Sequence, residues 1–337
     1  MIHFQWKDRY NINYKDIDEQ HKGLLGILND LLDLVEAQSQ PEQVTGIFHR
    51  LFAYTQHHFA TEERYLRKAH WVGLLVHIGE HGAFSRKLLE LNERYDPSNP
   101  ELIQETLTFL RSWYLNHIMD MDMAYVPHLN ALRGKLPVRA VLLACDGVLG
   151  TFDPAEFAKR LGALAGKEPA ELAQTLSGPG SPVGDYECGR IDGAALCARI
   201  SEICGADLAM AAVAEAYTEG WSPNPEIAEL LQALKPKVQL GLVCEVGPLR
   251  MEKVIQPLPS FALFDAVALG FDMKASGPSP FLLGDLLAKL DLISEECVYV
   301  DPRADCVEEA DAARFHAIKF TSAAALSKEL KALNLGV

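Results

Sequence analysis

The hydrophobic pattern of this 337-residue chain changes abruptly near residue 134 and divides the chain into two parts. Residues 18–125 repeat apolar side chains every three to four positions, which is typical of amphipathic helices. Residues 138–144 instead read as one strand buried on both faces of a parallel sheet. Because domains cluster near roughly 100 to 200 residues, a chain of this length has room for two. We therefore predict a helical domain over 1–133 and an α/β domain over 134–337.

Four helical segments are predicted in the first part, near residues 18–38, 42–67, 72–94 and from 100 to past Trp113. Pro41 opens the second segment, because proline is favoured in the first turn of a helix. Asp96 and Pro97 end the third. Four amphipathic helices with short connections predict an up-down four-helix bundle.

Strand candidates recur through the second part, at residues 138–144, 238–243, 265–269, 297–301 and 317–320. Helical stretches separate them, and this alternation is typical of an α/β domain with a parallel sheet. The fold class predicted for the whole chain is thus multi-domain, α followed by α/β.

Charge and composition limit the partners of the chain. The net charge of −15 is spread over both parts, so each part repels nucleic acid and anionic lipid. The sequence has no run near the roughly 20 apolar residues that cross a bilayer. The seven cysteines all lie in the second part, form no CxxC pair, and read as reduced thiols. We expect a cytoplasmic protein without nucleic-acid or membrane partners.

Histidine is concentrated in the helical part, which holds ten of the eleven. The bundle pattern directs seven polar side chains inward: His21, His58, Glu62, His77, His81, His117 and Asp122. Two pairs, His58 with Glu62 and His77 with His81, are four residues apart and so share a helical face. Asp122 follows His117 by five residues, which turns it off that face. The fourth helix must therefore bend or end between them if Asp122 is to reach the core.

Five imidazoles and two carboxylates are more donors than one tetrahedral zinc ion uses. Two irons, each five- or six-coordinate and bridged by carboxylates, would use all seven. A bridging carboxylate also holds two like-charged cations together, and Glu62 and Asp122 are the candidates for that role. The donor set therefore predicts a metal pair.

Four motifs carry a resemblance to the bacterial hemerythrin family: FQWKDRYNINYKDIDEQHKGL at residues 4–24, HHFATEE at 57–63, HIGEHGAF at 77–84 and SWYLNHIMDMD at 112–122. The resemblance covers roughly residues 1–130 and fills all seven ligand positions of the family. It implies two non-haem irons, bridged by carboxylates and an oxo or hydroxo group, that bind dioxygen.

By the same resemblance, one iron is held by His77, His81 and His117 and is coordinatively filled. The other is held by His21 and His58 and keeps an open position for dioxygen. Two aromatic residues beside the motifs, Phe59 and Trp113, are candidates for the walls of the dioxygen pocket, although plain core packing is an equal alternative.

The second part resembles the haloacid dehalogenase (HAD) superfamily, in the branch with a helical cap after the first strand. The motifs are AVLLACDGVLG at residues 140–150, YECGRIDGAAL at 186–196, WSPNPEIAELLQALK at 221–235 and VYVDPRADCVEEADAARF at 298–315. The resemblance implies a Rossmann-like core of about residues 138–150 and 233–337, with a cap over 151–232.

The catalytic positions implied by that resemblance are altered. Ala144 stands where the family has its aspartate nucleophile, two residues before the acid/base Asp146, and a methyl group cannot attack phosphorus. Cys244 replaces the Ser or Thr that ends the second core strand. Asp301 remains in the last acidic loop, but Pro302 follows where a second carboxylate helps to hold magnesium. We expect weak or absent Mg²⁺ binding and a catalytically inactive domain.

Two alternatives preserve some chemistry in this domain. Lys274, three residues before Gly277, is a candidate substitute for the phosphate-binding lysine of the family. Cys145 is a candidate nucleophile, although its alternating position predicts that it points away from the cleft.

The leading functional hypothesis is oxygen sensing, with the second domain as an output or interaction module that binds a protein partner or self-associates. Nitric oxide and peroxide stay open as alternative ligands. The other hypotheses are an oxygen carrier or storage protein, a di-iron oxidase or peroxidase, and an oxygen-regulated phosphatase.

Overall fold

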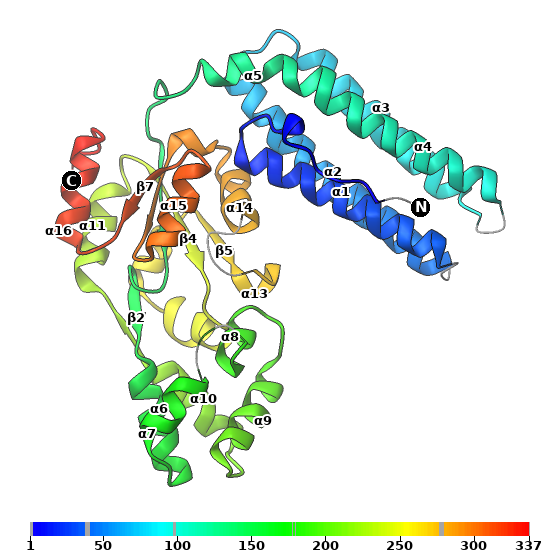
Figure 1. The fold of residues 1–337 in the computed structure, drawn as a ribbon. Coiled ribbons are helices and arrows are strands. Elements are labelled where there is room, and N and C mark those ends of the chain that lie inside the picture. Colours follow the sequence, from blue (N-terminus) through cyan, green and yellow to red (C-terminus); the bar gives the residue numbers. More distant parts are fainter. Residues whose placement is uncertain are drawn as a thin grey trace. The chain divides into compact units, whose positions relative to one another are not determined.

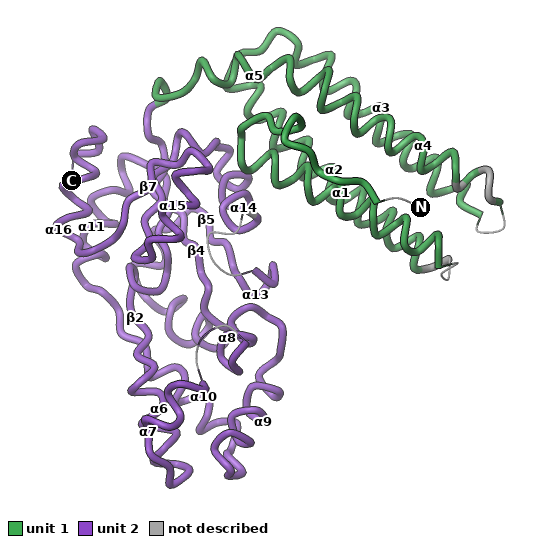
Figure 2. Tube along the Cα trace, in the orientation of Figure 1, with its two compact units in different colours: residues 1–136 green, residues 137–337 purple. Residues whose placement is uncertain are grey.

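The computed structural model describes residues 3–37, 41–96, 99–176, 178, 180–275 and 280–336. They form two compact units, residues 1–136 and 137–337, which Figure 2 draws in different colours. The first unit is helical and the second is α/β (Figure 1), so the predicted fold class is confirmed.

Long helices make up the first unit, after a short 3₁₀ turn, η1 (Asp8–Tyr10). They are α1 (Lys15–Glu36), α2 (Pro41–Lys68), α3 (Leu74–Arg94) and α4 (Pro100–Asn116), which α5 (Met123–Asn130) extends. Both ends were predicted for α1, α2 and α3, and each predicted end lies within three residues of the observed one. Apolar side chains spaced by three or four residues along α1, such as Leu24, Leu28 and Leu31, are buried in the core of the bundle.

The fourth helix is irregular between His117 and Asp122, where the sequence predicts that it bends or ends. Residues His117–Asp122 form a π-helix, η2, between α4 and α5. The wider turn of a π-helix brings positions five residues apart onto one face, and such segments are common at functional sites. His117 and Asp122 are both buried as a result, and the predicted irregularity is confirmed.

A five-stranded parallel sheet organises the second unit, with the strand order β5-β4-β1-β6-β7. Its strands are β1 (Ala140–Ala144), β4 (Gln239–Cys244), β5 (Ala266–Leu269), β6 (Cys297–Asp301) and β7 (His316–Lys319). All five were predicted, with ends displaced by at most two residues. The central strands β1 and β6 are buried along their whole length, because helices cover both faces.

The helices beside the sheet pack against its two faces. They are α11 (Pro225–Leu234), α14 (Pro280–Leu290), α15 (Ala304–Ala312) and α16 (Ala323–Ala332). Shorter turns are α12 (Pro248–Arg250), η3 (Met251–Ile255), η4 (Pro259–Leu263), α13 (Gly270–Met273) and η5 (Ser294–Glu296). Residues 225–232 were assigned to the cap from the sequence, but Ile227 and Leu231 pack in the core cluster of the sheet.

A helical cap follows β1, entered and left through the antiparallel pair β2 (Gly150–Phe152) and β3 (Trp221–Pro223). Its helices are α6 (Pro154–Ala165), α7 (Pro169–Leu176), α8 (Pro182–Glu187), α9 (Gly193–Cys204) and α10 (Met210–Glu219). They enclose an apolar cluster of their own. The turn after β1 needs Gly147, because its φ is +78° and a Cβ there would lie 2.6 Å from the ring of Pro302.

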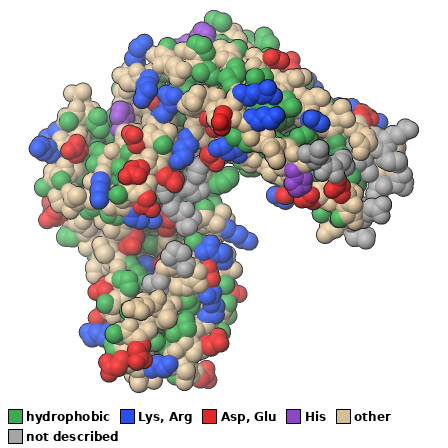
Figure 3. Space-filling view, viewed as in Figure 1, with side chains coloured by type: hydrophobic (Ala, Val, Ile, Leu, Met, Phe, Trp, Pro, Cys, Tyr) green, Lys and Arg blue, Asp and Glu red, His purple; other side chains and the backbone are tan. Residues whose placement is uncertain are grey.

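On the face drawn in Figure 3, acidic and basic side chains are interspersed and few histidine atoms are visible. Within the described ranges, no helix is both long enough and apolar enough to cross a membrane.

Candidate metal centre and the cleft of the second unit

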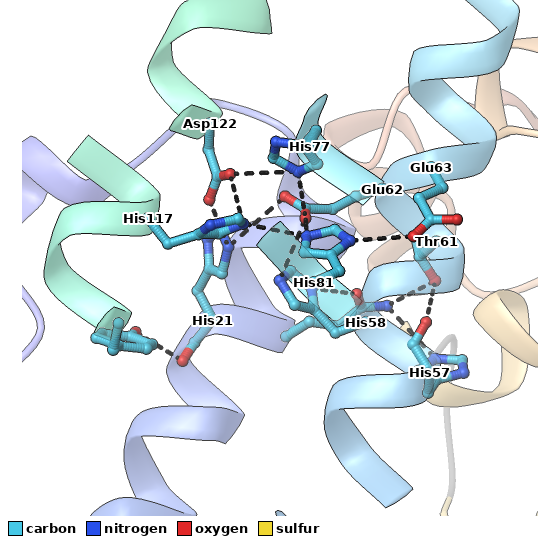
Figure 4. Close-up of polar contacts among 12 residues, drawn as sticks. His21, His57, His58, Thr61, Glu62, Glu63, His77, His81, His117 and Asp122 are labelled. Atoms are coloured by element: carbon cyan, nitrogen blue, oxygen red, sulfur yellow. Dashed lines mark hydrogen bonds and ion pairs between the residues drawn. The ribbon is translucent and has the colours of Figure 1, made fainter. Parts of the chain in front are cut away.

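The seven predicted ligand residues meet in the middle of the bundle (Figure 4). Each of the helical segments contributes: His21 from α1, His58 and Glu62 from α2, His77 and His81 from α3, and His117 and Asp122 from η2. All seven residues are at most 4% exposed. The helical spacing predicted from the sequence thus brings every one of these side chains to a single buried site.

Glu62 is the residue that joins two groups of donors. One group is Glu62, His77, His81 and His117, and the other is His21, His58 and Glu62; the donor atoms within each group lie within 4.8 Å of one another. Oε2 of Glu62 is 3.3 Å from Nε2 of His77 and 3.2 Å from Nε2 of His81. The same oxygen is 3.6 Å from Nε2 of His58. Each group could hold a metal ion, and Glu62 belongs to both groups.

Asp122 also lies between histidines of both groups. Its Oδ2 is 3.2 Å from Nε2 of His21, and its Oδ1 is 3.3 Å from Nε2 of His117. The π-helix makes this placement possible, since His117 and Asp122 point to the same side of the helix. Asp122 is therefore a second carboxylate within reach of histidines from both groups.

Several donor atoms of the site lack a hydrogen bond among the described residues. They are both ring nitrogens of His21, Nδ1 of His77, and both carboxylate oxygens of Asp122. A buried polar atom left in this state costs about 1–3 kcal/mol, so folded proteins rarely contain a group of them. Metal ions would satisfy these atoms, and imidazole with carboxylate is a donor set that suits iron.

The electrostatics of the site favour neutral imidazoles for most of its histidines. Burial lowers the pKa of His58 well below its usual value and lowers that of His117 to about 3. For His81, burial also acts to lower the pKa, but Glu62 and Glu63 outweigh it and raise the pKa to about 9. Burial, together with the charge of Glu62, raises the pKa of Asp122 well above its usual value. A neutral imidazole is the form that binds a metal ion, so burial prepares most of the site for metals.

Three further side chains hold the ligands in place, and none of them is among the residues predicted from the sequence. Oε1 of Gln20 is 3.1 Å from Nδ1 of His58, and Oε1 of Glu63 is 3.1 Å from Nδ1 of His81. The hydroxyl of Tyr125 donates to Oε1 of Glu62 over 2.5 Å. Such outer contacts fix the orientation of a ligand. Gln20 and Glu63 are adjacent to ligands in the sequence, which is the local signal that could have found them. Tyr125 is near Asp122 in the sequence, but no local spacing indicates its contact with Glu62.

Phe59 and Trp113, the candidate pocket walls, stack on ligand rings. The ring of Phe59 lies parallel to that of His81 with centroids 3.7 Å apart, and Trp113 lies over His117 at 4.3 Å. Trp113 also lines a small apolar cavity with Leu24 and other core residues. Both rings thus pack against the larger group of histidines. Their role toward dioxygen stays a prediction.

A cavity of about 620 Å³ in the second unit lies at the carboxyl ends of β1, β4 and β6. Ala144 and Asp146 line it, as the sequence resemblance implied. Asp146 accepts a hydrogen bond from the backbone N–H of Phe152, and burial raises its pKa. Asp301 ends β6 and is fully buried. Cys244 ends β4 and is likewise fully buried.

The two residues considered as alternative catalytic groups differ in position. Cys145 was expected to point away from the cleft; it is among the residues that line the cavity, although it is only 1% exposed and packs in the core cluster. Lys274 ends α13 in a left-handed conformation and is exposed, and it is not among the described residues that line this cavity. Gly277, the reference point for Lys274, lies outside the described residues.

An ion pair between the buried Arg250 and the partly exposed Glu187 connects the cap to the core of the second unit. Arg250 of α12 is 1% exposed and lies between the rings of Phe152 and Tyr217, 3.9 Å from each centroid. It donates to Glu187 at the end of α8 over 2.9 Å, and the Tyr217 hydroxyl donates to the same carboxylate. Burial raises the pKa of Glu187 to about 7.

Comparison with known proteins identifies the class of each unit. The family model of the hemerythrin HHE cation binding domain matches residues 13–129. The bacteriohemerythrin of Clostridium acetobutylicum is 30% identical over 127 residues, which cover 36% of this chain and 98% of that protein. The myohemerythrin of Riftia pachyptila is 26% identical over 122 residues, covering 36% of this chain and 90% of that protein.

The second unit is similar in fold to solved HAD structures. A HAD-like family hydrolase from Porphyromonas gingivalis is 21% identical, with a TM-score of 0.51, and the match covers 58% of this chain and 98% of that one. A HAD family enzyme from Bacteroides thetaiotaomicron is 15% identical over the same shares, also with a TM-score of 0.51. At these identities the likeness shows the fold alone.

Fold, site and comparisons define a protein that combines a histidine- and carboxylate-rich helical bundle with a HAD-like α/β domain. The chain belongs to the hemerythrin family through its N-terminal domain. Membership in this family and the buried cluster of histidines and glutamate together support binding of non-haem iron.

Proposed function

We propose that the N-terminal domain holds two irons that bind dioxygen reversibly, and that the chain serves as an oxygen sensor whose HAD-like domain is a non-catalytic output or interaction module. One observation carries the di-iron proposal: Glu62 and Asp122 each lie within reach of histidines from both donor groups. A single ion could use only one of the two donor groups, and it would not need two carboxylates that reach both groups.

The two groups differ in the number of histidines, and this difference assigns their roles. His77, His81 and His117 would hold one ion, and His21 and His58 would hold the other. With fewer histidines, the second group would leave room for an external ligand. When bound, the iron pair supplies the electrons that dioxygen takes up reversibly. The residues of the chain exclude water from this position, because all of the ligands are at most 4% exposed.

Loading and ligand binding test this proposal directly. We expect two irons per chain after reconstitution, and a new visible charge-transfer absorption when the reduced protein meets oxygen in a stopped-flow instrument. The variant His58→Ala should lose one of the two irons. Its matched control is His57→Ala, which changes the neighbouring residue outside both donor groups. One zinc per chain, or no spectral change with oxygen, would refute the di-iron proposal.

Fusion to a second domain favours sensing over transport or storage. That domain carries Ala144 where the HAD resemblance places a nucleophile. This supports a domain that interacts with a partner and does not hydrolyse a substrate. A sensor must change the state of its output module when oxygen binds, whereas a carrier need not. Small-angle scattering or hydrogen exchange of the second domain, compared between the deoxy and oxygenated forms, separates the two. Sustained oxygen or peroxide consumption with a reductant would instead indicate an oxidase or peroxidase.

A further inference from the structure

The carboxylate of Asp301 is completely engaged by groups of the chain itself. Asp301 is 0% exposed at the carboxyl end of β6, where the HAD resemblance places a magnesium ligand. Its Oδ1 accepts from the backbone N–H of Arg303 over 2.9 Å and from Nε of Arg303 over 3.0 Å. Its Oδ2 accepts from the Tyr299 hydroxyl over 2.7 Å and from an Nη of Arg303 over 2.8 Å. Four donors saturate this carboxylate, three of them from one residue.

The same guanidinium reaches a second acidic residue of the cleft. The Nη atom that donates to Asp301 also donates to Oε2 of Glu245 over 2.5 Å. Glu245 follows β4, and Asp301 ends β6, so the two carboxylates come from the strands on either side of β1. A single nitrogen that contacts both shows that they lie close enough to share one cation.

We propose that the guanidinium of Arg303 is the resident cation of this cleft and takes the place that magnesium has in active HAD enzymes. The chain therefore does not bind a divalent ion there, and removal of Arg303 opens a divalent-cation site at Asp301 and Glu245.

Charge and geometry both support this replacement. A guanidinium is always charged and presents a rigid fork that matches a carboxylate at two points. Burial acts to lower the pKa of Arg303, but Asp301 and Glu245 outweigh it and raise the pKa further above its ordinary value. Magnesium demands near-octahedral geometry and gives up its water reluctantly, so it competes poorly for a carboxylate already held by a tethered cation. An approaching ion would also be repelled by the positive charge of Arg303.

The test is magnesium titration of the full-length, iron-loaded protein, comparing the native chain with Arg303→Met. Methionine keeps much of the length of the side chain and removes its charge. In isothermal titration calorimetry the native chain should show no magnesium binding. The variant should bind magnesium at least about tenfold more tightly than the detection limit that applies to the native chain. Arg190→Met is the matched control, because Arg190 lines the same cavity but pairs with Asp185. It should behave like the native chain.

Thermal unfolding gives a second readout. Without its partner, Asp301 is a buried uncompensated charge, so Arg303→Met should lower the melting temperature of the second domain, and magnesium should restore part of the loss. If Arg303→Met does not fold, the native chain still tests the proposal. Magnesium binding by the native chain that is lost in Asp301→Asn would overturn it. Equal magnesium binding by the native chain and Arg303→Met would also overturn it. The proposal does not depend on iron or oxygen, whose absorption reports on the first domain separately.

Discussion

Removal of one hydroxyl, in Tyr125→Phe, should weaken iron binding without changing any proposed ligand. Tyr125 is fully buried in α5, and its hydroxyl donates to Oε1 of Glu62 over 2.5 Å. Glu62 is the carboxylate shared by the two donor groups. The substitution therefore removes the contact that fixes the position of Glu62 and leaves every donor atom of the site in place.

The size of the effect follows from the chemistry of this hydrogen bond. A hydrogen bond to an ionised group contributes about 1.5–3 kcal/mol, and full burial of both partners places this one toward the upper end. Glu62 is ionised in the folded protein: burial acts to raise its pKa, but the histidines around it outweigh burial and hold the pKa well below its usual value. Because 1.4 kcal/mol corresponds to a factor of ten, we expect iron affinity to fall about 10- to 100-fold.

Tyr65→Phe is the matched control for this prediction. Tyr65 is also fully buried in the bundle, and its hydroxyl donates to the carboxylate of Asp16 over 2.7 Å. Asp16 belongs to neither donor group. Both variants should lower the free energy of unfolding of the iron-free protein by about 2 kcal/mol, measured by urea denaturation. Only Tyr125→Phe should lower the iron affinity, measured by competition with a chelator.

Two results would refute the reasoning. If both variants bind iron as tightly as the native chain, the hydroxyl of Tyr125 does not position Glu62. If both lose iron affinity equally, the loss reflects general destabilisation of the bundle and not the contact with Glu62.

Three further predictions follow from the same structure. Removal of iron by a chelator should lower the melting temperature of the N-terminal domain in calorimetry and leave that of the second domain unchanged, since the buried donor atoms of His21 and Asp122 then have no hydrogen bond among the described residues. Phe59→Ala should destabilise the bundle by about 3–5 kcal/mol in urea unfolding, because Phe59 is 4% exposed and packs on His81. Burial raises the pKa of Glu187 from 4.5 to about 7, so the folded state favours the protonated form. The contribution of Glu187 to the free energy of unfolding is therefore complete below pH 4.5 and is lost as the pH rises through 7. Glu187→Gln should remove this dependence, worth up to about 3 kcal/mol, from the unfolding free energy measured between pH 5 and 8.

Hydrophobic periodicity determined most of the fold, because burial is the dominant constraint in both units. The strand at Cys297–Asp301 was predicted with its exact ends, since an apolar run between polar helices has no other stable place than the middle of a sheet. Residues 225–232 were assigned to the cap because motif order along the chain does not show which cluster a helix joins. Ile227 and Leu231 decide this by packing into the core of the sheet, and that is a tertiary contact.

The ligand set of the candidate site was visible in the sequence, whereas the groups that support it were not. Histidine and carboxylate spacings of four residues report a shared helical face directly. The spacing of five between His117 and Asp122 predicts that the fourth helix bends or ends there, and the structure has a π-helix at this place. The hydrogen bond from Tyr125 to Glu62 joins residues 63 apart on different helices, so no local spacing reveals it. The contact of Arg303 with Glu245 spans 58 residues and was missed for the same reason.

The two domains answer the same electrostatic problem in different ways. Each brings two carboxylates together, and the second pairs the buried Asp301 with the partly exposed Glu245; carboxylates removed from water need a positive partner to stay ionised. In the second domain Arg303 supplies that charge, so Asp301 and Glu245 are balanced within the chain. In the first domain, the ion-pair partners of Glu62 and Asp122 among the described residues are all histidines, and burial lowers the pKa of several of these. We therefore propose that metal ions supply most of the positive charge that would keep both carboxylates ionised.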